Sequence, residues 1–229
     1  MKTAAPKLPY VLDEAVDWQA CQRDGRVRGA YLKGLDLSDA DLEEMTFDRC
    51  VLEQCRLTGA NLERCSFTDV KLIGCELSGA NCANGIWTRC AFADCRMLGA
   101  NFYGAGLHDV CFGDCRMEDS DFCASRWRKT SLQGCRLMRA RLSEAALQDF
   151  TAQDCDFGGV NFFRTPLSGI DFSRCTLEGI QAAGQELHGM IVSERQAAGL
   201  ARLLGIVIRE DYPVHPCRFW LARVHKKYL

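Results

Sequence analysis

Residues 60–79 read ANLER CSFTD VKLIG CELSG, four groups of five in which the third residue is always leucine or phenylalanine. Taking every fifth residue from Leu32 to Leu187 gives 32 consecutive positions, and nearly all of them hold Leu, Phe, Met or Trp. Only Cys82, Ala152 and Ala182 are smaller. A period of five fits neither an amphipathic helix nor a plain strand. The chain is therefore built from short internal repeats, and these decide its architecture.

A second periodic position lies two residues before each large apolar residue and holds smaller side chains such as Ala60, Cys65 and Val70. We interpret the two positions as inward-facing, one large and one small in each repeat. Asn, Asp and Gly are frequent at the remaining positions, and these residue types suit exposed corners.

Three segments of the repeat, Ala60-Asn61-Leu62, Ala80-Asn81-Cys82 and Ala100-Asn101-Phe102, resemble the A(D/N)LXX consensus of pentapeptide repeat proteins. The resemblance covers roughly residues 27–192. It implies an all-β fold, a right-handed quadrilateral β-helix with four repeats in each 20-residue coil and about eight coils in total. Coils stacked at the usual inter-strand spacing of about 4.8 Å make a rod about 38 Å long, in which each coil contacts only its neighbours.

The chain divides into four parts on this basis. Residues 1–26 form an N-terminal cap, 27–192 the β-helix, 193–208 a C-terminal cap, and 209–229 a basic aromatic tail. Ser193 and Gln196 make a capping box, and the apolar spacing predicts a helix over 194–204 that Gly205 ends. Residues 206–208 are predicted to be a short apolar strand. Caps are needed because the end coils otherwise expose unpaired strand edges.

The 20-residue coil places residues that are 20 apart above one another, which turns the sequence into columns. Seven cysteines form one inward column, namely Cys55, Cys75, Cys95, Cys115, Cys135, Cys155 and Cys175. We interpret them as small buried hydrophobes. No CxxC motif occurs, and zinc requires tetrahedral clusters rather than a line. We therefore expect neither a metal nor another cofactor, and the thiols should stay reduced in the cytoplasm.

Two outward columns carry charge. The first alternates in sign at every coil and predicts an exposed, self-neutralising ladder worth well under ~1 kcal/mol per pair: Arg49, Asp69, Arg89, Asp109, Lys129, Asp149. The second holds Arg96, Arg116 and Arg136 in succession. Either neighbouring carboxylates such as Glu118 and Asp119 pair with these arginines, or the column is a contact site for an acidic partner. Both interpretations stay open.

Other outward residues are candidates for binding a partner. Asp94, Asp114 and Asp154 form a modest acidic patch on another face. Tyr103 and Phe163 share one outward column, and exposed aromatic side chains on a β-helix face can form a binding surface.

The C-terminal cap, from Ser193 to Ile208, resembles the end of the Qnr and MfpA quinolone-resistance proteins. The resemblance implies that this end carries a homodimer contact, with Leu200, Leu203 and Leu204 as candidate residues. It also implies binding to DNA gyrase or topoisomerase IV by imitation of duplex DNA, and protection of the enzyme from quinolones or toxins. The alternative is a plain protein–protein interaction scaffold with an unknown partner.

Charge limits the imitation of DNA. Residues 27–192 contain 23 acidic and 17 basic residues, a net charge of −6. B-DNA carries one charge per about 1.7 Å, so a 38 Å length holds roughly 22. Any mimicry must therefore be confined to one face.

Composition and motifs exclude several classes. With 48% hydrophobic and 25% charged residues in 229, the chain is globular, and a formal net charge of −2 argues against direct nucleic-acid binding. No apolar run approaches the ~20 residues of a membrane span, and residues 1–10 do not resemble a secretory signal, so we expect a cytoplasmic protein. The histidines lie at repeat corners or in the tail (His108, His188, His215 and His225), which offers no catalytic constellation, so we expect no enzyme.

The tail is the least typical part of the chain. Residues 193–229 hold seven Lys and Arg but only three Asp and Glu, and Phe219, Trp220 and Tyr228 lie among the basic residues. The tail is either a basic amphipathic helix for a membrane or a partner, or a segment that folds back over the dimer seam.

Overall fold

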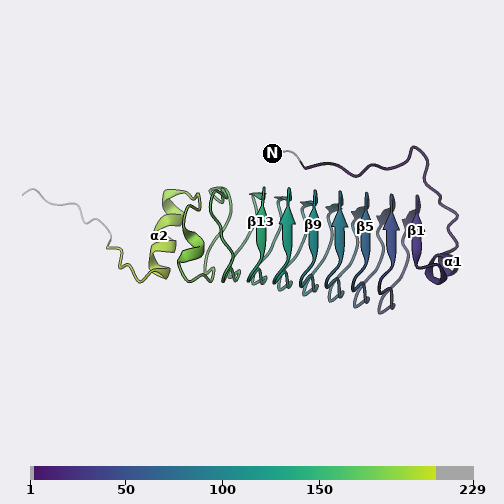
Figure 1. Ribbon diagram of the computed structural model, residues 1–229. Helices are drawn as coiled ribbons and strands as arrows, with labels where there is room; N and C mark the ends of the chain where they lie inside the picture. Colours follow the sequence, from purple (N-terminus) through teal and green to yellow (C-terminus); the bar gives the residue numbers. More distant parts are fainter. Residues whose placement is uncertain (1–2, 210–229) are drawn as a thin grey trace, which may run out of the picture.

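A computed structural model describes residues 3–209 of the chain. Within them the molecule is a parallel β-solenoid, drawn as a row of stacked arrows in Figure 1, with one sheet of seven three-residue strands on each of two faces. The sheet on face 1 contains β1 (Arg26–Arg28), β3 (Thr46–Asp48), β5 (Ser66–Thr68), β7 (Ile86–Thr88), β9 (Gly106–His108), β11 (Arg126–Arg128) and β13 (Ala146–Gln148). The sheet on face 2 contains β2 (Tyr31–Lys33), β4 (Val51–Glu53), β6 (Lys71–Ile73), β8 (Ala91–Ala93), β10 (Cys111–Gly113), β12 (Ser131–Gln133) and β14 (Thr151–Gln153).

The register is 20 residues throughout, as the repeat predicts. Each strand pairs in parallel with the strand one coil further on, so that Phe47 lies beside Phe67 and Phe67 beside Trp87. The other two sides of each coil carry isolated bridges instead of strands. Face 3 contains the bridged column that begins at Asp36, and face 4 the column that begins at Asp41. The expected all-β solenoid with a C-terminal helix is confirmed.

The core fills the bore of the solenoid with the large residues of the repeat. Phe67 is buried and stacks between Phe47 and Trp87, with ring centroids 4.6 and 3.9 Å away. Room for Trp87 comes from Gly85, where an added Cβ would lie 3.2 Å from the indole nitrogen. Trp127 is buried too, and its indole N–H donates to the Ser125 hydroxyl over 2.7 Å. Both tryptophans are core residues, as the sequence indicates.

Corner residues have left-handed backbone conformation. The last residue of most repeats has a φ of about 50° to 76°, in nineteen cases with a residue other than glycine. Aspartate is the commonest of these, because its short polar side chain tolerates the left-handed region better than most. The corners therefore hold carboxylates in rows that run along the rod.

The eighth coil differs from expectation. Seven coils carry strands on faces 1 and 2, whereas residues 166–185 keep the 20-residue spacing only through bridges such as Asp156 to Thr176 and Asn161 to Gln181. Pro166 stands at the first position of the missing face 1 strand. One coil earlier, Ala146 occupies the equivalent position and donates its N–H to the carbonyl oxygen of Ser125. Proline has no N–H to donate, so the ladder ends there.

The two ends are closed by helices. At the N-terminal end, Asp17 is the N-cap of α1 (Trp18–Arg23), and Val16 and Trp18 pack against the core. At the C-terminal end, η1 (Gln185–Leu187) leads to α2 (Glu194–Leu203), which begins with the expected Ser193–Gln196 capping box.

One expectation for the C-terminal end is wrong. Residues 206–208 are not a strand but exposed coil, because no neighbouring strand edge among residues 3–209 pairs with them. At the N-terminal end, residues 3–12 lie outside the cap formed at α1 and run back along the side of the rod (Figure 1). Apart from Arg209, the basic tail lies outside the described residues, so both interpretations of it stay predictions.

Candidate functional site

The acidic candidates lie in a row at the corner after the face 2 strands. Asp94 follows β8 and Asp114 follows β10, one coil apart, and both are exposed. The Asp114 carboxylate extends over Gly134 of the next coil, where an added Cβ would lie 2.3 Å from Oδ1. Among residues 3–209 neither aspartate has an ion-pair partner, so this short row presents two uncompensated carboxylates.

The third acidic candidate is neutralised within the chain. The Asp154 carboxylate accepts a hydrogen bond from Arg174 at 2.9 Å and another from the Gln133 amide at 2.9 Å. Asp154 therefore adds little charge to the row formed by Asp94 and Asp114.

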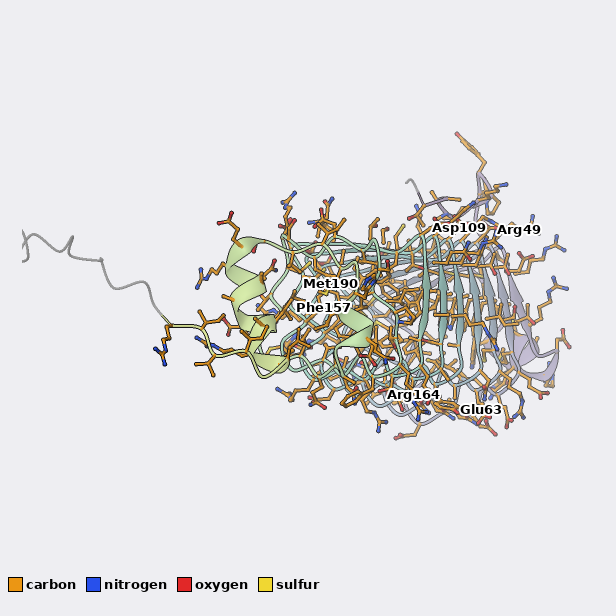
Figure 2. The ribbon with its side chains drawn as sticks, turned by 60° about the vertical axis from the view of Figure 1, so that its left-hand side comes forward. Arg49, Glu63, Asp109, Phe157, Arg164 and Met190 are labelled. Carbon is orange, nitrogen blue, oxygen red and sulfur yellow. The ribbon has the colours of Figure 1, made fainter. Side chains whose placement is uncertain are left out.

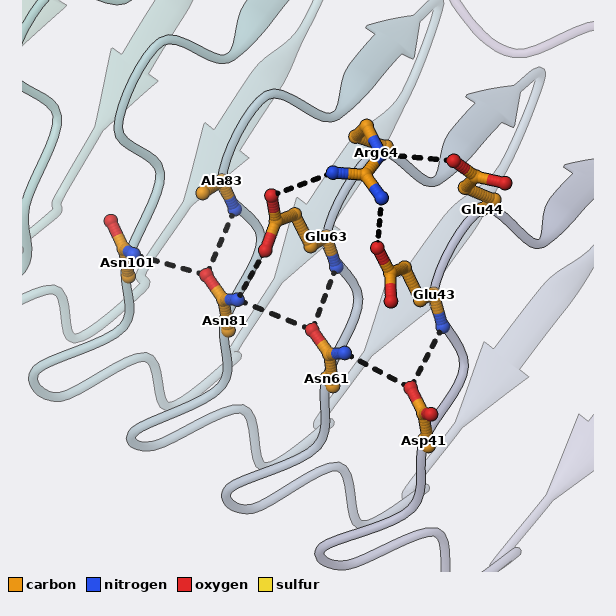
Figure 3. A network of polar contacts seen from close by, with 9 residues as sticks. All are labelled: Asp41, Glu43, Glu44, Asn61, Glu63, Arg64, Asn81, Ala83 and Asn101. Atoms are coloured by element: carbon orange, nitrogen blue, oxygen red, sulfur yellow. Dashed lines mark hydrogen bonds and ion pairs between the residues drawn. The ribbon is translucent and has the colours of Figure 1, made fainter.

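The aromatic candidates lie on face 4, away from the acidic row. The side chains of Tyr103 and Phe163 are 50% and 42% exposed and stand three coils apart. Face 4 also holds a ladder of side-chain amides that the sequence analysis missed, in which Asn61, Asn81 and Asn101 are linked over 3.2 and 3.0 Å (Figure 3). The 20-residue spacing of these asparagines was the available signal.

Face 4 is acidic at its N-terminal end, where one arginine contacts three glutamates. The Arg64 guanidinium donates to Glu44 and Glu63 over 3.0 Å each, and also to Glu43 (Figure 3). The Glu63 carboxylate additionally accepts from Asn81 over 3.3 Å. Further along face 4, near the exposed aromatic residues, acidic and basic side chains pair one to one, as Asp121 does with Arg141 and Glu144 with Arg164.

Arginines of the face 3 column pair with neighbouring carboxylates. Arg116 donates to Glu118 over 3.3 Å, and Glu118 is buried. Arg96 reaches Glu76 at 4.0 Å, whereas Asp119 takes a bidentate pair of 2.7 Å bonds from Arg139. This favours the interpretation in which neighbours compensate the arginines.

The alternating column at the corner after face 1 is covered at Asp69 and Asp109, not exposed throughout as expected. Asp69 and Asp109 are only 5% and 8% exposed, because the N-terminal segment lies over them. Burial alone raises the pKa of Asp69, but the ion pair with Arg89 and the hydrogen bond from the Lys7 amide outweigh it and leave that pKa below its usual value. Figure 2 shows Asp109 and Arg49 on one edge of the rod and Glu63 and Arg164 on the other.

The seven cysteines of the inward column are buried free thiols. Several of these thiols donate a hydrogen bond to a backbone carbonyl of the preceding coil. The Cys75 thiol, for example, donates to the Leu52 carbonyl over 3.3 Å. Burial raises the pKa of Cys90, which occupies the equivalent site on face 1, to about 12. The Cys90 thiol is therefore protonated at neutral pH, and a thiol in that form is neither a nucleophile nor a metal ligand.

We expect the thermal unfolding midpoint to be the same with and without reductant, and with and without a chelator, because the thiols act only as packing groups. Circular dichroism at increasing temperature measures this. A shift of several degrees with either additive contradicts the assignment.

The C-terminal end presents apolar side chains. Leu203 and Leu204 are 43% and 56% exposed, and the adjoining segment 206–208 is exposed as well. Leu200, by contrast, is half-buried and packs against the core. The candidate dimer contact therefore reduces to Leu203 and Leu204 with residues 206–208, and dimerisation itself stays a prediction.

A groove of about 780 Å³ lies between α2 and the last coil. Arg174, Arg195 and Arg202 line it together with Glu178. Among residues 3–209 there is no group of three or more His, Cys, Asp or Glu side chains arranged to hold a metal ion. None of the helices in this part of the chain has the length and apolar character needed to cross a membrane.

Comparison with known proteins identifies the repeat. A family model described as "Pentapeptide repeat region" matches residues 28–102, 65–137 and 105–182. No curated protein sequence matches the chain significantly.

Several solved structures are similar. Full-length QnrB1, a plasmid-mediated fluoroquinolone resistance protein, is 18% identical over 86% of this chain and 97% of its own, with a TM-score of 0.30. Rfr23 from the cyanobacterium Cyanothece is 16% identical over 74% of this chain and 92% of its own, with a TM-score of 0.27. HetL from Nostoc, a pentapeptide repeat protein involved in heterocyst differentiation regulation, is 19% identical over 74% of this chain and 90% of its own, with a TM-score of 0.22. At this level no function transfers from these proteins.

Proposed function

The chain belongs to the pentapeptide repeat family, and from that premise we propose that it is a non-catalytic, dimeric binding protein whose partner is DNA gyrase or topoisomerase IV. It would occupy part of the DNA-binding surface of the enzyme and protect the enzyme from quinolones or toxins.

The row of Asp94 and Asp114 is the observation that carries this proposal. Both carboxylates are exposed at one corner of a straight rod and lack an ion-pair partner among residues 3–209. Neighbouring corners are about 4.8 Å apart along the axis, and phosphates follow each DNA strand at about 3.4 Å per step. The row thus offers a short stretch of negative charge whose spacing is of the same order as, though wider than, that of one DNA strand.

The imitation of DNA is partial. Many acidic side chains on the other faces pair with a basic residue one coil away, as Glu144 does with Arg164 and Asp121 with Arg141. These pairs cancel charge where DNA would present phosphates. Binding must therefore combine the acidic row with shape and with neutral contacts elsewhere on the rod.

We expect the double variant Asp94→Asn and Asp114→Asn to bind gyrase about tenfold more weakly, because two charge-assisted contacts become neutral. Asparagine keeps the left-handed corner conformation, so the fold is preserved. Surface plasmon resonance with immobilised gyrase measures the change. Asp149→Asn is the matched control, since it removes a corner carboxylate from a different row. Equal affinity of all three proteins contradicts the assigned surface.

A second candidate function is a protein-interaction scaffold, and the exposed Tyr103 and Phe163 on face 4 favour it. Under this alternative, Tyr103→Ser with Phe163→Ser abolishes binding to the physiological partner, whereas changes at Asp94 and Asp114 leave it intact. The two sets of variants therefore separate the two functions.

A further inference from the structure

The N-terminal segment, residues 3–10, follows the corner between faces 1 and 2 across several coils. The Lys7 N–H donates to Asp69 Oδ1 over 2.8 Å, and the Ala4 N–H donates to Asp109 Oδ1 over 3.1 Å. Further along, the Thr3 hydroxyl donates to the hydroxyl of Ser131 over 3.1 Å. Figure 1 shows this segment running from α1 back over the middle of the rod. Contacts between such distant parts of the chain define a specific docking path.

Three half-buried residues of the segment are spaced three residues apart. They are Thr3, Pro6 and Pro9; Leu8 is half-buried as well, whereas Ala4 and Lys7 are exposed. Three residues per turn is the period of the polyproline II helix. Pro6 and Pro9 favour this conformation, because proline fixes φ near −65° and restricts the residue before it. Proline has no N–H, and the two backbone donors of the segment are at other positions, Ala4 and Lys7.

The two donors match the spacing of the two acceptors. Ala4 and Lys7 are one polyproline II turn apart, about 9.3 Å at a rise of 3.1 Å per residue. Asp69 and Asp109 are two coils apart, about 9.6 Å at 4.8 Å per coil. Aspartates occur at every second coil of this column, and Arg89 occupies the coil between Asp69 and Asp109. The corner therefore presents one carboxylate for each turn of such a segment.

Side chains of the rod itself position the two acceptors. The Arg89 guanidinium donates two hydrogen bonds of 2.7 Å to the Asp69 carboxylate, and Nδ1 of His108 lies 3.1 Å from Oδ2 of Asp109. A carboxylate fixed in this way forms strong hydrogen bonds to backbone amides. The donors at Ala4 and Lys7 bond only to side chains, while the sheet ladders beneath remain complete without them. The segment can thus leave without unpairing a strand.

We propose that the corner formed by Asp69, Arg89 and Asp109 is a binding groove for a polyproline II segment of a partner protein, and that residues 3–9 are its resident ligand within the chain. The groove recognises a backbone N–H at every third residue, with proline or another half-buried side chain between the donors. A partner with an exposed, proline-containing segment binds by displacing residues 3–9.

Full-length variants test the groove. Pro6→Gly with Pro9→Gly loosens the resident segment by making it more flexible before docking. A fluorescently labelled peptide with the sequence of residues 3–10, TAAPKLPY, is then titrated and followed by anisotropy. We expect it to bind the glycine variant about tenfold more tightly than the unaltered chain, where residues 3–9 compete at high effective concentration.

Two matched changes identify the acceptors. Adding Asp69→Gly and Asp109→Gly to the loosened variant should weaken peptide binding by about tenfold or more, since both carboxylates are lost. Glycine suits these left-handed corners, as Gly29 of the same column shows. Asp114→Gly, in another column, should leave binding unchanged. The proposal is overturned if the peptide binds none of the proteins, or binds the variants with and without Asp69 and Asp109 equally.

Hydrogen exchange gives a second readout on the full-length protein. The amides of Ala4 and Lys7 should exchange slowly in the unaltered chain and lose most of that protection in Asp69→Gly with Asp109→Gly. Fast exchange of both amides in the unaltered chain also overturns the proposal, because the segment would then not be docked.

Discussion

Replacing Phe67 with alanine should lower the free energy of unfolding by about 3–5 kcal/mol, the usual cost of removing a buried phenylalanine. Phe67 is 1% exposed and stacks between Phe47 and Trp87. The backbone of a solenoid cannot close around the cavity easily, because the hydrogen bonds of adjacent coils fix the bore. Guanidinium unfolding followed by circular dichroism measures the loss.

The same change at an outward position serves as the control. Phe163 is 42% exposed on face 4, so Phe163→Ala should change stability by no more than about 0.5 kcal/mol. Similar losses for the two variants would mean that the inward and outward positions of the repeat have been assigned incorrectly.

The second large effect concerns oligomeric state. Leu203→Glu with Leu204→Glu should convert a dimer into a monomer, because it places two carboxylates in the exposed apolar end of the rod. Light scattering coupled to gel filtration measures the mass directly. The expected result is half the mass of the unaltered protein with an unchanged circular dichroism spectrum.

The control for the dimer contact uses charge elsewhere on α2. Ala197 is exposed on the same helix, so Ala197→Glu adds a carboxylate and should leave the mass unchanged unless the interface extends there. Leu200 is unsuitable for this test, since it packs against the core and its replacement would disturb the cap itself. A monomeric unaltered protein, or an unchanged mass after both leucines are replaced, contradicts the dimer.

The fold was largely predictable because the five-residue period states directly which side chains face inward. Phe67, Trp87 and the cysteine column are buried where the period places them. Strand register followed from the same count, since any slip would turn large apolar residues outward. The capping box was legible because it depends only on residues 193–196.

Features outside the period could not be predicted in the same way. The burial of Asp69 depends on Lys7, which is 62 residues away and carries no repeat signal. The loss of the face 1 strand in the eighth coil depends on Pro166, which lacks an N–H. Pairing among the surface charges, such as that of Asp154 with Arg174, depends on side-chain conformations, which the sequence alone does not specify.

The acidic row of Asp94 and Asp114 was named from the sequence, but its separation from Asp154 was not. The sequence places all three in one column, and only the contacts show that Arg174 and Gln133 occupy the third carboxylate. The candidate surface is consequently smaller than the sequence suggested.

The supercoiling activity of DNA gyrase, measured with and without a fluoroquinolone while the purified protein is added, tests the proposed function most directly. At micromolar protein the account predicts either relief of drug inhibition or inhibition of supercoiling, with either effect reduced by Asp94→Asn with Asp114→Asn. Supercoiling that is unchanged by the protein, both with and without the drug, would contradict a role directed at the topoisomerase.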